Sequence, residues 1–138
     1  MPSFTEIRDD FEFLDEWDDR YKYIIDLGRN LAPYPEEFRD DAHKVRGCAS
    51  QVWLHMVRDG DVYKLRGDSD AHIVKGLVAI LITLYTDKTP QQITDTDTDA
   101  ELAAFDLKDH LTPQRSNGLA SMVKRIRAIA AQEDTATS

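Results

Sequence analysis

The segment from residue 71 to residue 86 restricts the fold more than any other part of this chain. It follows a Gly-Asp-Ser-Asp turn at 67–70 that ends in a good helix-capping residue, and its apolar spacing predicts a helix. The apolar residues are Ile73, Val74, Leu77, Val78, Ile80, Leu81 and Leu84. Because they cover too much of the helix surface for a face open to water, we expect this helix to lie at the centre of the fold.

A β-hairpin is predicted directly before this helix. Residues 50–58 are rich in β-branched and aromatic types, and their side chains alternate as those of a strand do. Asp59 and Gly60 are a strong signal for a two-residue turn, after which residues 61–66 give the return strand. Residues 44–46 are expected to add a short third strand. The predicted class is α+β, with a small antiparallel three-stranded sheet flanked by helices.

Two helices are expected before the sheet. Ser3 and Glu6 form a capping box that starts the first of them near Phe4. The second is expected to cover residues 15–26, with Gly28 as its C-terminal stop.

Further helices are expected after the central one. A short helix begins at Thr89-Pro90, and the last helix begins in the same way at Thr112-Pro113. The tail after about residue 132 is polar and is expected to fray. A length of 138 residues suits one compact domain, so we predict a single domain over residues 1–138.

The acidic composition argues against several classes of function. The formal net charge of −9 disfavours general binding to nucleic acid or to an anionic membrane surface. This charge serves solubility, or it forms an acidic face for a basic partner. The sequence has neither the layout of a signal peptide nor an apolar run long enough to span a bilayer, and a single cysteine cannot form an internal disulfide. A cytosolic location is the simplest prediction.

Cys48 is the candidate reactive group. It lies just before the first predicted strand, and Gly47 allows a backbone bend that would present the thiol at a loop apex. Sulfur chemistry needs the thiolate, and positive charge from the nearby His43, Lys44 and Arg46 would lower the thiol pKa. The alternative interpretation of a lone cysteine is a small buried apolar residue, and the sequence leaves both open.

Other kinds of chemistry find little support. The four histidines show no metal-ligand spacing, and one cysteine cannot complete a tetrahedral zinc site, so no metal site is expected. The sequence contains no glycine-rich loop that would cradle a phosphate, and no pattern that would hold a histidine against the thiol as in a cysteine protease.

Three motifs give the chain a resemblance to a known family. They are Val45-Arg46-Gly47-Cys48-Ala49-Ser50-Gln51-Val52-Trp53, Gly67-Asp68-Ser69-Asp70-Ala71-His72-Ile73-Val74-Lys75-Gly76 and Leu111-Thr112-Pro113-Gln114-Arg115-Ser116-Asn117-Gly118. Together with the preceding segment Pro33-Tyr34-Pro35, these motifs cover about residues 30–130. Each is weak alone, but in this order and spacing they resemble the SufE family of sulfur acceptors, which includes the close relative CsdE. The resemblance implies the α+β fold that the family shares with the scaffold IscU. IscU holds its cluster with three cysteines, so a single cysteine disfavours a cluster-scaffold role.

The resemblance implies sulfur transfer rather than a stand-alone enzyme activity. In the family, a cysteine desulfurase of the SufS or CsdA type forms a persulfide with its own pyridoxal phosphate. The loop cysteine, here Cys48, takes that sulfur, stimulates the desulfurase, and passes sulfur to the SufBCD scaffold for iron–sulfur cluster assembly. We therefore expect no cofactor on this chain, no direct contact with nucleic acid or membrane, and a monomer or weak homodimer.

The family pattern also implies roles for residues around Cys48. Arg115, in the third motif, is expected near the Cys48 loop, where it would hold the loop or stabilise thiolate and persulfide charge; otherwise it is a solvated residue at a helix start. Gly47 and Ser50 would shape the loop, and Gln51 would brace it unless it is an ordinary strand residue. The loop is expected to be partly buried, because family members shelter the thiol and swing it out to meet the desulfurase.

Two further residues are candidates for contact with the desulfurase. Asp70 is expected first to cap the central helix and second to bind the partner, and Arg46 adds positive charge beside the thiol. Two alternatives stay open. One is a CsdE-like carrier for another acceptor, such as a tRNA-modifying pathway. The other is a non-catalytic adaptor of the desulfurase, which binds without chemistry at Cys48.

Overall fold

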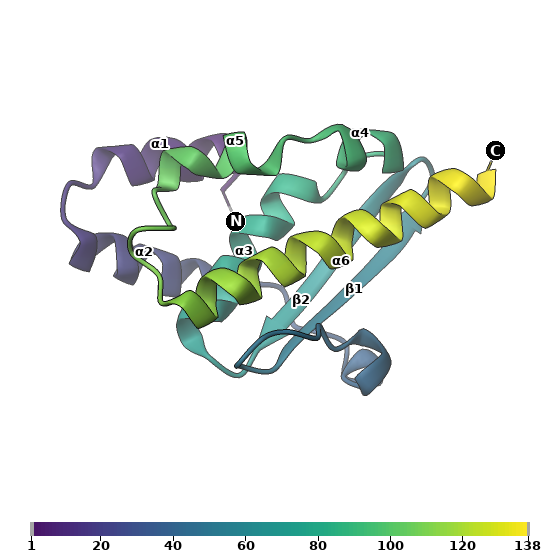
Figure 1. Ribbon diagram of the computed structural model, residues 1–138, viewed down its shortest axis with the longest axis horizontal. Coiled ribbons are helices and arrows are strands. Elements are labelled where there is room, and N and C mark those ends of the chain that lie inside the picture. The colour runs from purple at the N-terminus through teal and green to yellow at the C-terminus, as the bar shows by residue number, and fades with distance from the viewer. Residues whose placement is uncertain (1, 138) are drawn as a thin grey trace.

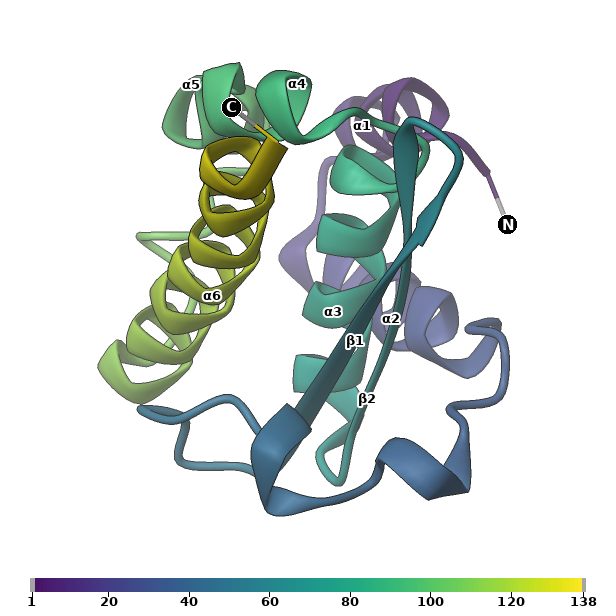
Figure 2. The ribbon, with the colours of Figure 1, turned by 90° about the vertical axis from the view of Figure 1, so that its right-hand side faces the viewer.

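The central helix of the fold is α3, His72–Tyr85, and it is buried on nearly every side. The computed structural model describes the backbone of residues 2–137 and the side chains of residues 2–132. Figure 2 shows α3 between the two-stranded sheet and the long C-terminal helix α6, Pro113–Thr137. Leu77, Val78 and Leu81 are at most 1% exposed, so the prediction of a central helix is confirmed.

The sheet is a single antiparallel hairpin. Strand β1, Val52–Asp59, pairs with β2, Val62–Ser69, from Val52 opposite Ser69 to Asp59 opposite Val62. The turn is therefore one residue later than predicted, at residues 60–61, and Gly60 takes a left-handed φ of +64° there. One face of the hairpin packs on α3, which makes the fold α+β as predicted (Figure 1).

The predicted third strand at residues 44–46 is wrong. Lys44 makes one isolated bridge to Trp53, and the Val45 N–H donates to the Val52 carbonyl at 2.8 Å. A 3₁₀ turn, η2 (Asp41–His43), ends just before this bridge, and a turn at residues 46–47 begins directly after Val45. Only two residues between these turns are extended, which is too few for a ladder, so the sheet has two strands.

Two helices precede the sheet and pack against α3. Helix α1 is Phe4–Phe13, and the Ser3 side chain accepts from the Glu6 N–H, so the predicted start is confirmed, with only this half of the predicted Ser3–Glu6 capping box formed. Helix α2 is Trp17–Arg29 and runs past the predicted stop. Figure 1 shows α1 and α2 on the same end of the molecule, opposite the free end of the hairpin.

Gly28 does not end α2, because it serves as a close contact between α2 and α3. A Cβ built at Gly28 would lie 2.8 Å from the Gly76 nitrogen, and one built at Gly76 would lie 2.1 Å from the Ile24 carbonyl oxygen. The two helices thus approach with only hydrogen atoms between their backbones. Gly76 consequently packs on α2.

Short helices connect α3 to α6. They are α4 (Pro90–Asp95), α5 (Thr98–Leu102) and the 3₁₀ turn η3 (Ala103–Phe105). The predicted capping box at Thr89 is confirmed, because its side chain accepts from the Gln92 N–H and the Gln92 side chain accepts from the Thr89 N–H. The predicted fraying after residue 132 concerns side chains outside the described part of the chain. The α6 backbone continues as a helix to Thr137.

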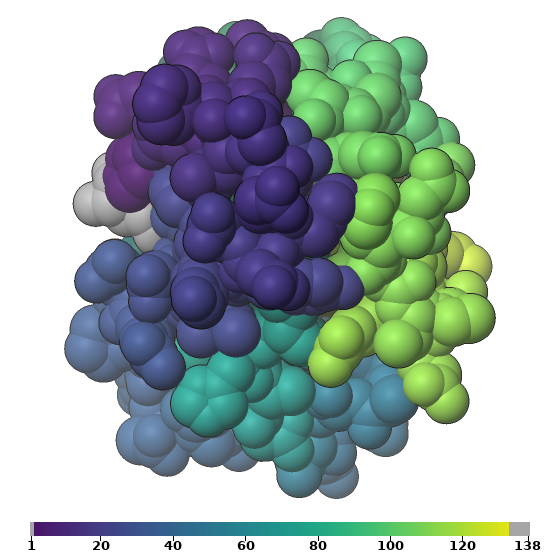
Figure 3. Space-filling model, turned by 90° about the vertical axis from the view of Figure 1, so that its left-hand side faces the viewer, coloured from purple at the N-terminus to yellow at the C-terminus, as the bar shows by residue number. Residues whose placement is uncertain are grey.

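The segment that leads into α6 covers the same face as α1 and α2. Phe105 packs against Phe11 with ring centroids 5.0 Å apart, and His110 stacks on Trp17 at 3.8 Å. The Tyr21 hydroxyl donates to the His110 carbonyl. Figure 3 shows this face, where the purple residues of α1 and α2 lie beside the green residues before α6. These contacts fix the start of α6, which forms one wall of the site described next.

Candidate functional site

Cys48 lies in the loop between η2 and β1, where it faces the first turns of α6. Its side chain is half-buried, and its thiol donates to the Gly118 carbonyl with an Sγ to oxygen distance of 3.6 Å. A Cβ built at Gly118 would lie 3.5 Å from this sulfur, so the sulfur rests on a stretch of helix surface without a side chain. The thiol is therefore neither free in solvent nor part of the main core.

Gly47 shapes the loop at the residue before the thiol. Its φ of +87° lies in the left-handed region, which side chains other than glycine adopt at a cost. A Cβ at this position would also lie 2.6 Å from the Ser121 Oγ on α6. The backbone therefore favours glycine here, and any side chain would also have to displace the Ser121 hydroxyl.

Both ends of the loop are held by hydrogen bonds to the hairpin region. At the first end, Val45 and Lys44 pair with β1 as described above. At the second end, the Gln51 carbonyl accepts from the Ser69 hydroxyl at 2.8 Å and from the Asp70 N–H at 3.2 Å. The Asp70 carboxylate in turn accepts from the Gln51 N–H at 3.0 Å. Gln51 is held through its backbone, while its side chain is exposed.

The predicted role of Asp70 as the cap of the central helix is wrong. Ala71 is the N-cap residue of α3, and no side-chain bond caps this helix. The Asp70 carboxylate bonds the Gln51 N–H instead, because the chain turns sharply from β2 into α3 and brings this side chain to the end of the Cys48 loop. The acidic residue therefore holds the loop and not the helix.

A pocket of about 200 Å³ opens beside the thiol. Its lining comes from the Cys48 loop, from the first turn of α3 and from the start of α6. The lining residues are Cys48, Ala49, Ser50, Val74, Thr112, Gln114, Arg115, Gly118 and Met122. The structure thus brings Cys48, Ser50 and Arg115 to one pocket.

The other sequence-selected residues lie around this pocket rather than in it. Gln51 and Asp70 hold the loop, while Arg46 is exposed beside it. The α6 residues Gly118 and Ser121 were missed by sequence reasoning. Gly118 ends the third motif, so a glycine inside a predicted helix was the available signal for a close approach.

Burial raises the pKa of the Cys48 thiol. The lowering of this pKa expected from His43, Lys44 and Arg46 does not occur, because burial dominates, Arg46 is exposed and His43 pairs with another residue. The His43 Nδ1 lies 2.7 Å from the Asp40 carboxylate, and its ring packs on Phe38 with the centroids 5.1 Å apart. The sheltered form of the site therefore favours the neutral thiol over the thiolate.

Two features are absent from the residues that the structure describes. Within residues 2–132, no group of three or more histidine, cysteine, aspartate or glutamate side chains is placed to hold a metal ion. Among the helices described, none is both long and apolar enough to cross a bilayer.

These features define a class of protein: a small α+β domain with one half-sheltered thiol on a loop that is held at both ends. The chain belongs to the SufE family, because the family model described as "Fe-S metabolism associated domain" matches residues 5–130. This family has a sulfur-transfer role together with a cysteine desulfurase, and membership connects the chain with iron–sulfur metabolism.

Relatives of similar length support this assignment. An uncharacterized SufE-like protein of Rhizobium meliloti is 48% identical over 132 residues, which are 93% of this chain and 94% of the relative. One from Rhizobium etli is 50% identical over 131 residues, 92% of this chain and 88% of the relative. A solution structure of a hypothetical protein from Thermus thermophilus has the same fold, with a TM-score of 0.77 and 18% identity over 96% of each chain.

Proposed function

We propose that this chain accepts persulfide sulfur on Cys48 from a cysteine desulfurase, stimulates that enzyme, and delivers the sulfur to a SufBCD-type scaffold in the cytoplasm. The observation that carries the proposal is the position of the one thiol, which rests half-buried against Gly118 on a short loop held at both ends. A carrier benefits from this arrangement, because a persulfide is easily reduced or oxidised when it is exposed.

The transfer step moves one sulfur atom between two thiols. The Cys48 thiolate attacks the terminal sulfur of the donor persulfide, so that a new S–S bond forms at Cys48 while the donor S–S bond breaks. The donor leaves as a thiolate and takes up the proton that Cys48 lost. Atoms and electrons balance without an added oxidant or reductant. The pyridoxal phosphate that creates the donor persulfide belongs to the desulfurase.

The raised pKa of the sheltered thiol gives the loop a role in this step. Inside the pocket burial disfavours the thiolate, so Cys48 becomes a better nucleophile when the loop moves outward to meet its donor. Arg115 lines the same pocket and supplies positive charge for the thiolate or persulfide. Gly47, Ser50 and Gln51 set the loop conformation, while Asp70 and Arg46 contribute exposed charge for contact with the desulfurase.

Intact-mass measurement after incubation with a desulfurase and free cysteine tests the proposal. The wild-type chain should gain the mass of one sulfur atom, and reduction with dithiothreitol should remove it. Cys48→Ser should gain nothing while keeping its fold and its binding to the desulfurase. Arg115→Gln should slow the gain, and Ser116→Ala, on the neighbouring residue outside the thiol pocket, serves as the control.

Two results would contradict the proposal. The first is an unchanged mass of the wild-type chain under conditions in which the desulfurase turns over. The second is full stimulation of the desulfurase by Cys48→Ser, which would mark the chain as an adaptor without chemistry. Addition of the scaffold to the persulfidated chain tests the delivery step, because sulfur should then leave Cys48.

A further inference from the structure

A second and larger pocket lies on the other side of α6 from Cys48. It has a volume of about 680 Å³, within the range of sites that take small organic molecules. The walls come from α5, η3, the turn before α6, and the α6 face that points away from the thiol. Arg115, Gly118 and Met122 line the thiol pocket, whereas Leu119, Val123 and Arg127 line this one. The two pockets therefore share a helix but no lining residue.

The middle of this second pocket is apolar. Leu102, Leu119 and Val123 are each only partly buried, although they pack against the core. Leu107 and Leu111 form the deeper wall and are 5% and 8% exposed. Aliphatic surface left partly open in a concave site favours an occupant with an apolar body, because its burial removes that surface from water.

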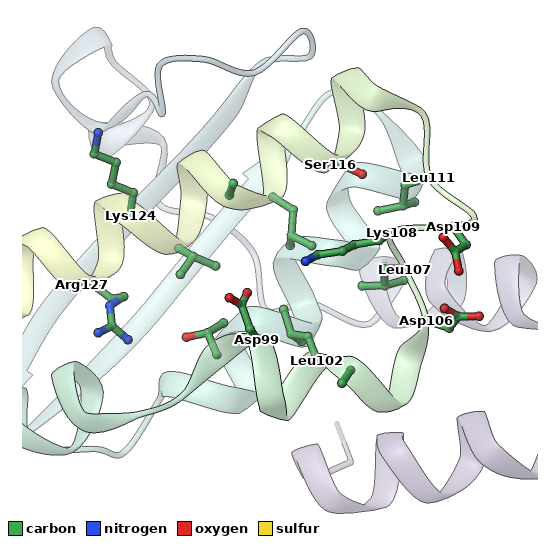
Figure 4. Close-up of a pocket in the computed structure, with 15 residues that line it drawn as sticks. Asp99, Leu102, Asp106, Leu107, Lys108, Asp109, Leu111, Ser116, Lys124 and Arg127 are labelled. Carbon is green, nitrogen blue, oxygen red and sulfur yellow. The ribbon is translucent and has the colours of Figure 1, made fainter.

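Charged side chains of both signs line the pocket. Figure 4 shows Asp106 and Asp109 at one end, Lys124 and Arg127 toward the other, Asp99 between Leu102 and Arg127, and Lys108 extended across the space. Asp106 is exposed and lies 3.7 Å from the His110 Nδ1. The basic end lies beside the apolar middle.

Because of Arg127, the basic end of the pocket should attract a charged group more strongly than the acidic end does. Its guanidinium is half-buried and donates to the Thr96 carbonyl at 2.7 Å and to the Thr94 carbonyl at 2.9 Å. No carboxylate of the described residues lies within 4.0 Å of it, so two neutral carbonyl groups fix its position, and the exposed Asp99 in the same pocket acts on it only at longer range. The pocket carboxylates are exposed, and water and salt screen them more effectively than a half-buried cation.

We propose that this pocket binds a small amphipathic anion, with its apolar body on Leu102, Leu119 and Val123 and its anionic group at Arg127. Lys124 lies one helical turn earlier, but it is exposed and points away from Arg127 in Figure 4, so it adds only longer-range attraction. The site goes beyond sulfur transfer and does not use Cys48.

The test is an amide NMR titration of the full chain with three ligands of matched shape: octanoate, octanamide and octylammonium. Octanoate should shift the signals of Leu102, Leu119 and Val123 with saturation in the millimolar range. Octanamide and octylammonium should each bind roughly fivefold more weakly, which is the effect of one ion pair in a partly screened site. Cys48→Ser should bind octanoate like the wild type, which separates this result from any failure of the sulfur-transfer proposal.

Charge variants on α6 complete the test. Arg127→Gln should weaken the binding of octanoate roughly fivefold and leave the binding of octanamide unchanged. Lys124→Gln changes an exposed residue and should weaken octanoate binding by a smaller factor. It replaces Arg127→Gln as the test if that variant does not fold. Arg125→Gln makes the same change in net charge on another face of α6, where Arg125 donates to the Ala42 carbonyl, and should have no effect.

Four outcomes would overturn the proposal. They are the absence of saturable shifts, shifts that map to the Cys48 pocket, equal affinity for octanoate and octanamide, or tighter binding of octylammonium. The last result would assign the pocket to a cation held by its aspartates.

Discussion

The Sγ of Cys48 lies 3.6 Å from the carbonyl oxygen of Gly118, so the thiol rests on helix backbone rather than on a side chain. A residue at this position larger than glycine would extend toward the sulfur, because a Cβ there already lies 3.5 Å from it. The size of residue 118 therefore controls how deeply the thiol is sheltered.

Enlarging residue 118 should expose the thiol in steps. Gly118→Ala adds one carbon at an ordinary contact distance and favours the helix by about 1 kcal/mol, so shelter and stability should be kept. Gly118→Leu extends a larger side chain toward the sulfur and should push the loop outward. The rate of alkylation of Cys48 by iodoacetamide should then rise on the order of tenfold, or about 1.4 kcal/mol of local opening. A leucine variant that reacts no faster than the alanine variant would refute this account of the shelter.

The raised pKa of Cys48 makes stability depend on pH in the alkaline range. Because burial holds the pKa of the folded thiol above its unfolded value of 9.0, the stabilisation is complete below that pH and is lost as pH rises through the folded pKa. The free energy of unfolding of the wild type should therefore fall more steeply above pH 9 than that of Cys48→Ala. Urea unfolding at a series of pH values measures the difference, and parallel curves would contradict the effect of burial.

Gly47 and Gly60 form a matched pair of left-handed glycines. Alanine at Gly60, with φ +64° and open space around it, should lower the free energy of unfolding by about 1 kcal/mol, which is the cost of the left-handed backbone conformation alone. Alanine at Gly47, with φ +87°, also meets Ser121 and should cost roughly 2–3 kcal/mol. The additional cost at Gly47 should shrink in a Ser121→Ala background, because this change removes the oxygen that would lie 2.6 Å from the new carbon. Equal costs at the two positions, from chemical denaturation, would exclude a steric role for α6.

The pair of Arg39 and Asp68 fastens the segment before the Cys48 loop to β2. Its Nη2 to Oδ2 distance is 2.8 Å, and the guanidinium also lies over Trp53, 4.8 Å from the ring centroid. Desolvation raises the pKa of Asp68, but bonds from Arg39, from the Ser69 N–H and from Lys75 outweigh it, so the pKa lies below its usual range.

Replacing Arg39 should therefore reduce the free energy of unfolding least at acidic pH. A carboxyl with a lowered pKa contributes stability above its unfolded pKa of 3.8, and that contribution is lost as pH falls through the folded pKa. Arg39→Met should lower the free energy of unfolding by about 1–2 kcal/mol at neutral pH and by less near pH 3. Arg29→Met is the control, because the Arg29–Asp26 pair is 67% and 64% exposed and should contribute almost nothing. A loss that does not depend on pH would assign the role of Arg39 to packing on Trp53.

Local patterns predicted the elements of this fold well. The broad apolar surface around Leu77 placed α3 at the centre, and the Thr89 cap fixed the start of α4. The third strand failed because turns on either side of Lys44 leave too few extended residues, and these turns depend on contacts with β1 and α6. Gly28 was misread because its partner, Gly76, is distant in sequence and only the packed helices bring them together.

The candidate site was predictable in part for the same reason. Cys48 and Gly47 stand out in the sequence, since a glycine beside a single thiol marks a special loop. The bond from Gln51 to Asp70 and the position of Gly118 depend on the packing of three elements, which no local spacing encodes. The second pocket was not foreseen, because Leu102 and Leu119 come from separate helices that meet only in the folded chain.

The hydrogen bonds at Val45 and Gln51 leave only the residues between them free to travel. Cys48 is three residues from either end, and three extended residues reach about 11 Å. Any excursion of the sulfur that keeps both ends fastened is limited to that radius. A donor cysteine must therefore be carried close to this surface on a protruding part of its own protein, since a thiol on so short a tether cannot enter a deep recess.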